Sequence, residues 1–201
     1  MEECAQRWEA WTPEGVAGRL VGISVPWCVV GGWALDLFVG TQTRDHEDLE
    51  IAVPRERFGE VAAAFGGYEW DVVGSGMVWA YRDAGDRAEF HQTWLRDPAT
   101  GKYHLDVFRE PHDGERWICR REPSITLPYT DLIEIGRAGI PYVIPEVALL
   151  FKAKAQRPKD QQDFDRVTPL LPDHRVARLA AWLARVHPHH DWLETLSGGE
   201  R

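Results

Sequence analysis

The chain reads Val-Val-Gly-Gly-Trp at residues 29–33 and His-Glu-Asp-Leu-Glu-Ile-Ala-Val at residues 46–53. These two stretches decide the fold. In the first, apolar residues 27–30 predict a short strand, the two glycines predict a tight turn, and residues 33–39 predict the start of a helix. A helix that begins at a glycine turn presents free backbone N–H groups and its positive end to an anion. The first stretch therefore predicts a phosphate-binding turn.

The second stretch carries a pair of acids. Asp48 and Glu50 alternate with apolar residues, so on a strand both carboxylates would share one face while the other face packs into the core. Two carboxylates on one edge repel each other, and Mg²⁺ relieves this because it takes hard oxygen ligands and leaves positions open for substrate phosphates. Each stretch alone has an ordinary explanation, as turn punctuation or as a solvated strand face. Together they indicate nucleoside triphosphate chemistry.

The residues around both stretches resemble a known family. Gly-Gly-Trp-Ala-Leu-Asp at 31–36 and Thr-Arg-Asp-His-Glu-Asp-Leu-Glu at 43–50 are similar to the signature of the nucleotidyltransferase superfamily, in the branch of the aminoglycoside 2''-adenylyltransferases. Residues 104–108, His-Leu-Asp-Val-Phe, resemble the strand that carries the third acid of this family, and residues 141–154 resemble its C-terminal helix. The chain departs from the superfamily in having Trp33 after the glycines, where Gly-Ser is common, and Glu50 in place of an aspartate.

The resemblance implies a reaction and a set of site residues. The enzyme would move a nucleoside monophosphate, AMP, from a nucleoside triphosphate such as ATP to a hydroxyl of a small cationic acceptor such as an aminoglycoside, releasing pyrophosphate. The expected catalytic and Mg²⁺-binding residues are Asp48, Glu50 and Asp106, of which Asp106 would also help to remove the proton of the acceptor hydroxyl. The expected nucleotide-binding residues are Gly31, Gly32, Trp33, Arg44 and Lys154.

Three of these residues keep a second explanation from the sequence. By spacing alone, Asp106 is a hairpin acid facing water, and only the resemblance favours a metal ligand. Arg44 either binds phosphate or pairs with an acid beside it. Lys154 lies on the inward stripe of the helix expected from Pro145, whereas Lys152 points elsewhere; a lysine at the end of such a stripe either reaches a triphosphate or extends its ammonium to water.

Composition narrows the setting. The chain has 201 residues, 44% of them apolar, which suffices for one core with a helical appendage. It has no apolar run of the roughly eighteen residues that a membrane span needs, and its N-terminus has no apolar signal segment. Cys4, Cys28 and Cys119 are scattered and odd in number, which predicts reduced thiols in a cytoplasmic protein. The net charge of -9 disfavours nucleic-acid binding and suits a cationic substrate, although many cytoplasmic proteins are as acidic.

The pattern as a whole predicts an α+β fold: a nucleotidyltransferase-like mixed sheet flanked by helices, with residues 1–144 as the core and residues 145–201 as a helical C-terminal region. The expected helices before this region cover residues 13–22 and a segment starting at Pro54. The expected strands cover residues 48–53, 68–73, 77–82, 89–95 and 103–108, followed by short strands within 111–128.

Other polar residues have simpler explanations than metal binding. Asp160 and Asp163 are expected to cap the next helix, because acids favour the first turn. His104 either tunes Asp106 or makes a local hydrogen bond, and residues 187–191 are expected to form a polar helix terminus.

Two other functions remain open. The same chemistry could act on tRNA or a protein, as in toxin-type relatives, which would need a concentrated basic groove. The chain could also be a catalytically silent nucleotide-binding domain, against which the three intact acids argue.

Overall fold

The computed structural model describes residues 7–84, 87 and 89–198. Its main sheet has the strand order β10-β11-β1-β2-β6-β5-β3-β4. The pairs β1–β11 and β2–β6 are parallel and the other neighbours are antiparallel, so the sheet is mixed. The strands of this sheet are β1 (Cys28–Val29), β2 (Glu50–Pro54), β3 (Glu69–Gly74), β4 (Met77–Ala80), β5 (Gln92–Arg96), β6 (Tyr103–Glu110), β10 (Ile133–Ile135) and β11 (Pro141–Val143).

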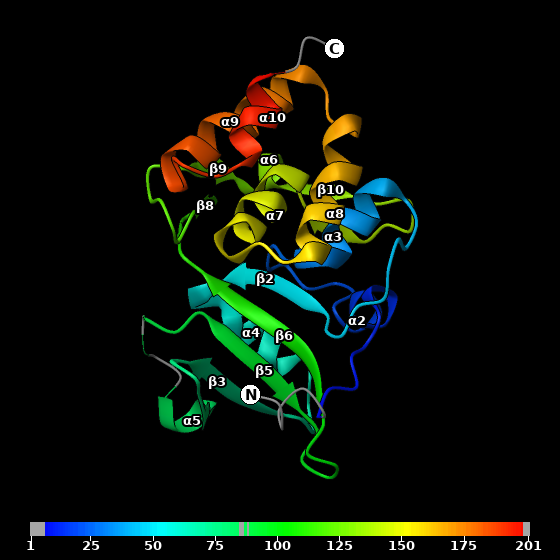
Figure 1. The fold of residues 1–201 in the computed structure, drawn as a ribbon. Coiled ribbons are helices and arrows are strands. Elements are labelled where there is room, and N and C mark those ends of the chain that lie inside the picture. The colour runs from blue at the N-terminus through cyan, green and yellow to red at the C-terminus, as the bar shows by residue number, and fades with distance from the viewer. Residues whose placement is uncertain (1–6, 85–86, 88, 199–201) are drawn as a thin grey trace.

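A smaller sheet and a set of helices complete the fold. The smaller sheet consists of β7 (His112–Asp113), β8 (Arg116–Ile118) and β9 (Thr126–Pro128). The helices are α2 (Pro13–Arg19), α3 (Gly31–Val39), α4 (Phe58–Ala63), α5 (Tyr81–Ala84), α6 (Tyr129–Leu132), α7 (Pro145–Lys152), α8 (Pro158–Val167), α9 (Asp173–Val186) and α10 (Trp192–Ser197). Figure 1 shows α7 to α10 gathered with α3 at one end of the molecule, beyond β2, and β3 and β5 at the other end. The predicted α+β fold is confirmed.

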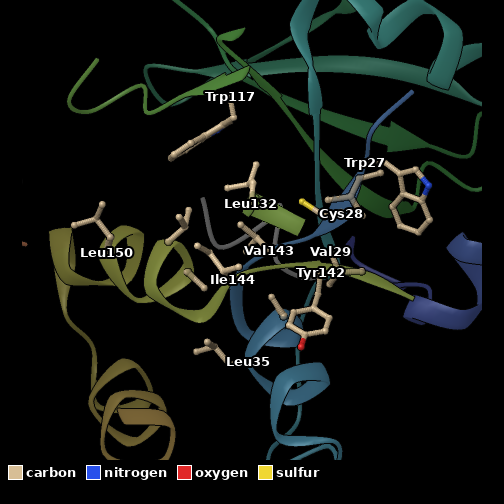
Figure 2. Close-up of a cluster of buried hydrophobic side chains, with 14 of the residues drawn as sticks. Trp27, Cys28, Val29, Leu35, Trp117, Leu132, Tyr142, Val143, Ile144 and Leu150 are labelled. Atoms are coloured by element: carbon tan, nitrogen blue, oxygen red, sulfur yellow. The ribbon is translucent and has the colours of Figure 1, made fainter. Parts of the chain in front are cut away.

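One continuous core joins the sheet to the C-terminal helices. Figure 2 shows Leu35 of α3, Cys28 of β1, Val143 of β11 and Leu150 of α7 in the same cluster of buried side chains. All elements of the structure after Val143 are helical, up to the last described residue. The division at residue 145 stays a prediction, because the core crosses it.

Several boundaries differ from the sequence-based expectations. Residues 141–154 are not one helix: Pro141–Val143 is strand β11, which pairs with β1 and β10, and the helix begins only at Pro145. Pro54 ends strand β2 and does not start a helix; a 3-10 turn, Arg55–Arg57, separates it from α4. Helix α3 begins at Gly31, two residues earlier than expected.

Two further expectations concern the setting of the protein. Cys28 and Cys119 are free thiols, as predicted, and Cys4 lies outside the described residues. The helices found in the described ranges are too short or too polar to cross a membrane. The cytoplasmic location stays a prediction.

Candidate active site

The parallel pairing of β2 and β6 brings two of the predicted acids together. In the register of these strands Glu50 is the partner of Asp106, and the backbone N–H of Asp106 donates to the carbonyl of Leu49 at 2.9 Å. Asp48 lies two residues before β2, so the expectation that both carboxylates stand on the strand is met only by Glu50. Leu49 and Ile51 are fully buried on the opposite face, as the alternation predicted. Glu50 and Asp106 therefore come from two neighbouring strands at one position of the sheet, and Asp48 comes from the segment that leads into β2.

The electrostatics of these acids reflect their proximity. Burial, followed by repulsion from Asp48, raises the pKa of Glu50 to about 7, although the nearby Lys152 and Arg120 act in the opposite direction. Burial, followed by repulsion from Glu50, raises the pKa of Asp106 well above its usual value. Groups that repel each other in this way gain from a cation between them. The acids thus form an electrostatically coupled set.

The donor chemistry of the acids suits Mg²⁺. Asp106 is 1% exposed; its Oδ2 accepts a hydrogen bond from Gln92 Nε2 at 2.5 Å, while its buried Oδ1 has no hydrogen-bond partner in the described part of the chain. A buried carboxylate oxygen without a partner needs a proton or a cation. The arrangement of these acids is more open than their chemistry, because among the residues that the structure describes no three His, Cys, Asp or Glu side chains lie close enough together to enclose an ion. The magnesium site at Asp48, Glu50 and Asp106 therefore stays a prediction.

The glycine turn lies beside the acids. Gly31 has a φ of +63°, which L side chains rarely adopt, and a Cβ at this position would overlap Glu50 Oε2. Helix α3 begins here, and Val30, its N-cap residue, makes no side-chain capping hydrogen bond. Gly32 is constrained differently, since a Cβ there would overlap Arg44 Nη2 and approach His46 Cε1 to 2.7 Å. Gly31 thus faces the acids, whereas Gly32 makes room for the packing of Arg44 and His46.

Arg44 and Trp33 take part in an extended polar network. Arg44 Nη2 donates to Asp163 Oδ2 at 3.0 Å and Arg44 Nε donates to Asp163 Oδ1 at 3.2 Å, across 119 residues of sequence. Trp33 stacks on the His46 ring at 4.4 Å, and His46 Nε2 lies 2.7 Å from Asp36 Oδ2. Arg44 therefore pairs with an acid that is distant in sequence, and not with one beside it. The nucleotide-binding roles of Arg44 and Trp33 stay predictions.

The positions of Lys152 and Lys154 differ from those that the helical stripe predicted. Helix α7 ends at Lys152, whose Nζ lies 2.9 Å from both Asp160 and Asp163 and which lines the cavity beside Glu50. The expectation that Lys152 points elsewhere is wrong, because its ammonium pairs with Asp160 and Asp163 of α8 at the edge of the cavity. Lys154 lies in the 3-10 turn that follows the helix, exposed, at the edge of the same cavity.

A cavity of about 400 Å³ extends from Gly31 and Glu50 over the β2–β6 face towards α7. Its apolar part includes Phe108, Trp117 and Phe151. Its cationic residues are Arg120, Arg121, Lys152, Lys154 and Arg157. Sequence reasoning missed Arg120, Arg121 and Arg157, because no periodic pattern marks them. The Arg-Arg pair at 120–121, between the short strands of 111–128, was the only signal.

The simpler explanation holds for Asp160 but not for Asp163. Asp160 accepts from the backbone N–H of Arg157 at 3.0 Å and completes a capping box at the start of α8. Asp163 lies in the middle of α8, where it bonds Arg44 and Lys152, so the expectation that it caps the helix is wrong. His104 Nδ1 lies 2.6 Å from the carbonyl oxygen of Glu9, so the histidine bonds a backbone group 95 residues away in the sequence. Residues 187–191 form the polar connection between α9 and α10.

Comparisons with known proteins agree with this geometry. Residues 15–76 match a family described as aminoglycoside-2''-adenylyltransferase. Two 2''-aminoglycoside nucleotidyltransferases, from Escherichia coli and Klebsiella pneumoniae, are each 42% identical to this chain over 40 residues, which is 20% of this chain and 23% of each relative. The 40-residue match thus spans less than a quarter of each relative. The family match at residues 15–76 contains the glycine turn and the acid pair.

Solved structures extend the likeness to most of the chain. A lincosamide antibiotic adenylyltransferase, LnuA, with lincomycin bound superposes with a TM-score of 0.55 and 17% identity, covering 79% of this chain and 95% of LnuA. ANT(2'')-Ia in complex with adenylyl-2''-tobramycin superposes with a TM-score of 0.55 and 17% identity, covering 86% of this chain and 95% of its own. At this identity the likeness concerns the fold. The chain therefore has the nucleotidyltransferase fold, and it resembles the aminoglycoside adenylyltransferases.

Proposed function

We propose that this protein is a magnesium-dependent nucleotidyltransferase that moves AMP from ATP to a hydroxyl of a small cationic acceptor, an aminoglycoside. The observation that carries the proposal is the direct pairing of Glu50 with Asp106 beside the Gly31 turn. Glu50 and Gly31 both line the cavity, and Asp106 is the direct strand partner of Glu50. A carboxylate pair beside a phosphate-binding turn supplies the two components that transfer from a triphosphate requires.

The nucleotide would bind along the glycine turn. The backbone at Gly31 and Gly32 would approach the β and γ phosphates closely, because neither residue has a side chain in the way. Lys154 would extend an ammonium from the edge of the cavity to the phosphates. Trp33 and Arg44 would support the turn from the network that joins α3 to α8.

The acids would carry out the chemistry. Asp48, Glu50 and Asp106 would hold Mg²⁺, which supplies charge stabilisation for the transferring phosphoryl group. Asp106 Oδ1 would take the proton from the acceptor hydroxyl, as its raised pKa favours. The hydroxyl oxygen then forms a bond to the α-phosphorus, the bond from the α-phosphorus to the bridging oxygen breaks, and pyrophosphate leaves with the bonding electrons.

The acceptor follows from the family match and from charge. ANT(2'')-Ia has been solved with an adenylylated aminoglycoside, and the matched family bears that activity in its description. A chain with 32 acidic and 23 basic residues has little surplus of cations for a polyanion but many carboxylates for ammonium groups. LnuA, which shares the fold and has been solved with lincomycin, makes a lincosamide the second acceptor to test.

The test is pyrophosphate release with each of the four nucleoside triphosphates and Mg²⁺, in the presence of kanamycin, lincomycin, tRNA or a protein acceptor. We expect release with ATP and kanamycin, and a mass increase of one AMP on the acceptor. Pyrophosphate release with lincomycin and no other acceptor would make a lincosamide the acceptor and leave the proposed nucleotidyl transfer standing. If the acceptor were tRNA, its affinity would fall with salt by about 0.9 log units per log unit of salt for each duplex phosphate contacted. No release with any pair, from a protein that binds no triphosphate, would overturn the proposal.

A further inference from the structure

Arg120 occupies a central position that its place in the sequence does not suggest. It follows β8 in the loop to β9, and its guanidinium carbon lies 4.7 Å from the ring centroid of Phe108 and 4.3 Å from that of Phe151. It lines the cavity of about 400 Å³ next to Glu50 and also a second cavity of about 330 Å³ next to Gln92. Gln92 donates a hydrogen bond to Asp106. Arg120 therefore lines one cavity together with Glu50 and another together with the hydrogen-bond partner of Asp106.

In the part of the chain that the structure describes, most N–H donors of the Arg120 guanidinium have no hydrogen-bond acceptor. Glu110 is the one hydrogen-bond and ion-pair partner that the described part of the chain gives to Arg120, through Nη1. An arginine carries five N–H donors in a planar fork. The remaining donors are therefore available to a group that enters either cavity.

Three of the other four cations of the cavity make several hydrogen bonds or ion pairs, and the fourth, Lys154, is exposed. Lys152 bonds Asp160 and Asp163, and Arg157 bonds Asp160. Arg121 donates to the carbonyl oxygens of Leu150 and Phe151 at the end of α7. Such partners hold these side chains in place as part of the fold. Arg120, in contrast, is held on one side by Glu110 and by two aromatic rings, which fixes the plane of the guanidinium without using all of its donors.

The electrostatics agree with a site for an anion. Burial lowers the pKa of Arg120 to about 10, and the charges of Glu50 and Asp106 act to raise it. Arg120 stays protonated near neutral pH, and a charge held in a partly desolvated site interacts more strongly than one in water.

We infer that Arg120 binds the phosphates of the triphosphate donor and remains bonded to the pyrophosphate as it leaves. The inference rests on the proposed function. A planar guanidinium suits phosphate oxygens, to which it can donate two parallel hydrogen bonds. In this role Arg120 complements the glycine turn. The turn, which follows β1, binds phosphate through backbone N–H groups. Arg120 binds it through a side chain from the loop between β8 and β9.

The test measures binding, without turnover. Isothermal titration calorimetry with a non-hydrolysable ATP analogue and Mg²⁺ compares the wild-type protein with Arg120→Met, Arg120→Lys and Arg116→Met. Arg116 is the matched control, since it lies on β8, is exposed and bonds only Thr126 in the described structure. We expect Arg120→Met to weaken binding by about tenfold to a hundredfold, because it removes charge-assisted hydrogen bonds. Arg120→Lys should weaken it less, and Arg116→Met should leave it unchanged.

A fourth variant separates electrostatics from damage to the fold. Glu110→Gln removes the carboxylate that competes with phosphate for Arg120 and keeps the shape of the side chain. We expect Glu110→Gln to bind the analogue at least as tightly as the wild type, the opposite sign from Arg120→Met. Circular dichroism and thermal unfolding test whether each variant is folded. If Arg120→Met does not fold, the affinities of Arg120→Lys and Glu110→Gln for the analogue decide the inference.

The outcomes for the inference and for the proposed function differ. A wild-type protein that binds the analogue, with unchanged affinity in folded Arg120→Met or Arg120→Lys, overturns the inference and leaves the function standing. A wild-type protein that binds the analogue through Arg120 but transfers nothing to any acceptor overturns the function and leaves the inference standing. A wild-type protein that binds no triphosphate overturns both.

Discussion

Glu50 on β2 and Asp106 on β6 are direct partners across two parallel strands, although 56 residues separate them in the sequence. Parallel neighbouring strands need a long crossover connection, and here the connection contains α4, β3, β4, α5 and β5. The pairing places two carboxylates at adjacent positions of a buried sheet face, where burial and the charge of Glu50 raise the pKa of Asp106. A fold that needed only stability would gain by replacing one of them.

The first prediction concerns these acids. Asp106→Asn and Glu50→Gln should each reduce transfer by about a hundredfold or more, as removal of a group that stabilises the transition state does. Neither should lower the thermal unfolding temperature, because each removes a charge that the neighbouring carboxylates repel. Steady-state kinetics and thermal unfolding measure the two effects. Asp131→Asn, at an exposed acid of α6, is the control and should change neither.

Turnover at the wild-type rate in folded Asp106→Asn would remove that residue from the reaction. A marked loss of stability in both variants would show that the acids serve the fold.

The sequence predicted the features of the site that depend on local patterns. The alternation of Glu50 with Ile51 predicted which face of β2 carries the carboxylate, and the Gly-Gly pair predicted the turn into α3, although the helix begins two residues earlier than expected. Such features follow from strand periodicity and backbone freedom, which are properties of a few neighbouring residues.

The sequence could not predict contacts made by tertiary packing. Arg44 and Lys152 both bond Asp163 of α8, and Lys152 also lines the cavity beside Glu50. Arg120 enters the site from a loop between short strands, where neither helical nor strand periodicity gives a direction to a side chain. The family resemblance identified the third acid, which spacing alone placed in water.

The second prediction distinguishes the two kinds of glycine. Gly31→Ala should destabilise the protein by about 1–3 kcal/mol, because Gly31 has a φ of +63° and its new Cβ would displace the Glu50 carboxylate. It should also weaken binding of a triphosphate analogue. Gly18→Ala is the matched control: Gly18 lies within α2, nothing lies within 4 Å of a Cβ there, and alanine favours a helix by about 0.5–1 kcal/mol. Chemical denaturation gives both values.

A Gly31→Ala protein as stable as the wild type, with full affinity for the analogue, would reduce the turn to ordinary strand-to-helix punctuation. A substitution at Gly32 is less informative about phosphate, because it also displaces Arg44 and His46.

The third prediction assigns Arg44. Arg44→Met should lower the free energy of unfolding by about 2–3 kcal/mol, because the side chain of Asp163 is 3% exposed and loses two hydrogen bonds from a charged donor. A double-mutant cycle with Asp163→Asn should give a coupling energy of about 1–3 kcal/mol. Measuring analogue affinity on the same folded variants separates the scaffold from a phosphate contact. Weakened binding in Arg44→Met but not in Asp163→Asn would show that Arg44 contacts the nucleotide directly.

The fourth prediction concerns the buried ion pairs that hold α9 to α7. Glu146 is fully buried; its carboxylate accepts from Arg175 Nη2 at 2.6 Å and also from Arg178. Burial by itself would raise the pKa of Glu146, but the hydrogen bonds from Arg175 and Arg178 outweigh it and lower the pKa below its ordinary 4.5. A lowered pKa in the folded state means that the stabilisation is complete above the unfolded pKa and is lost as the pH falls through the folded one.

Two consequences follow for Glu146→Gln. At pH 7 it should lower the free energy of unfolding by about 3–5 kcal/mol, because Arg175 and Arg178 lose their shared carboxylate. Below pH 4.5, where the wild type loses stability, the variant should lose less, since the group that takes up the proton is gone. Urea denaturation from pH 3 to pH 7 measures both. Glu60→Gln, at the exposed Arg57–Glu60 pair, is the control and should change little at either pH. If Glu146→Gln is as stable as the wild type at pH 7 and shows the same decline in acid, the pairs contribute nothing to joining α9 to α7, and the apolar core alone must hold these helices together.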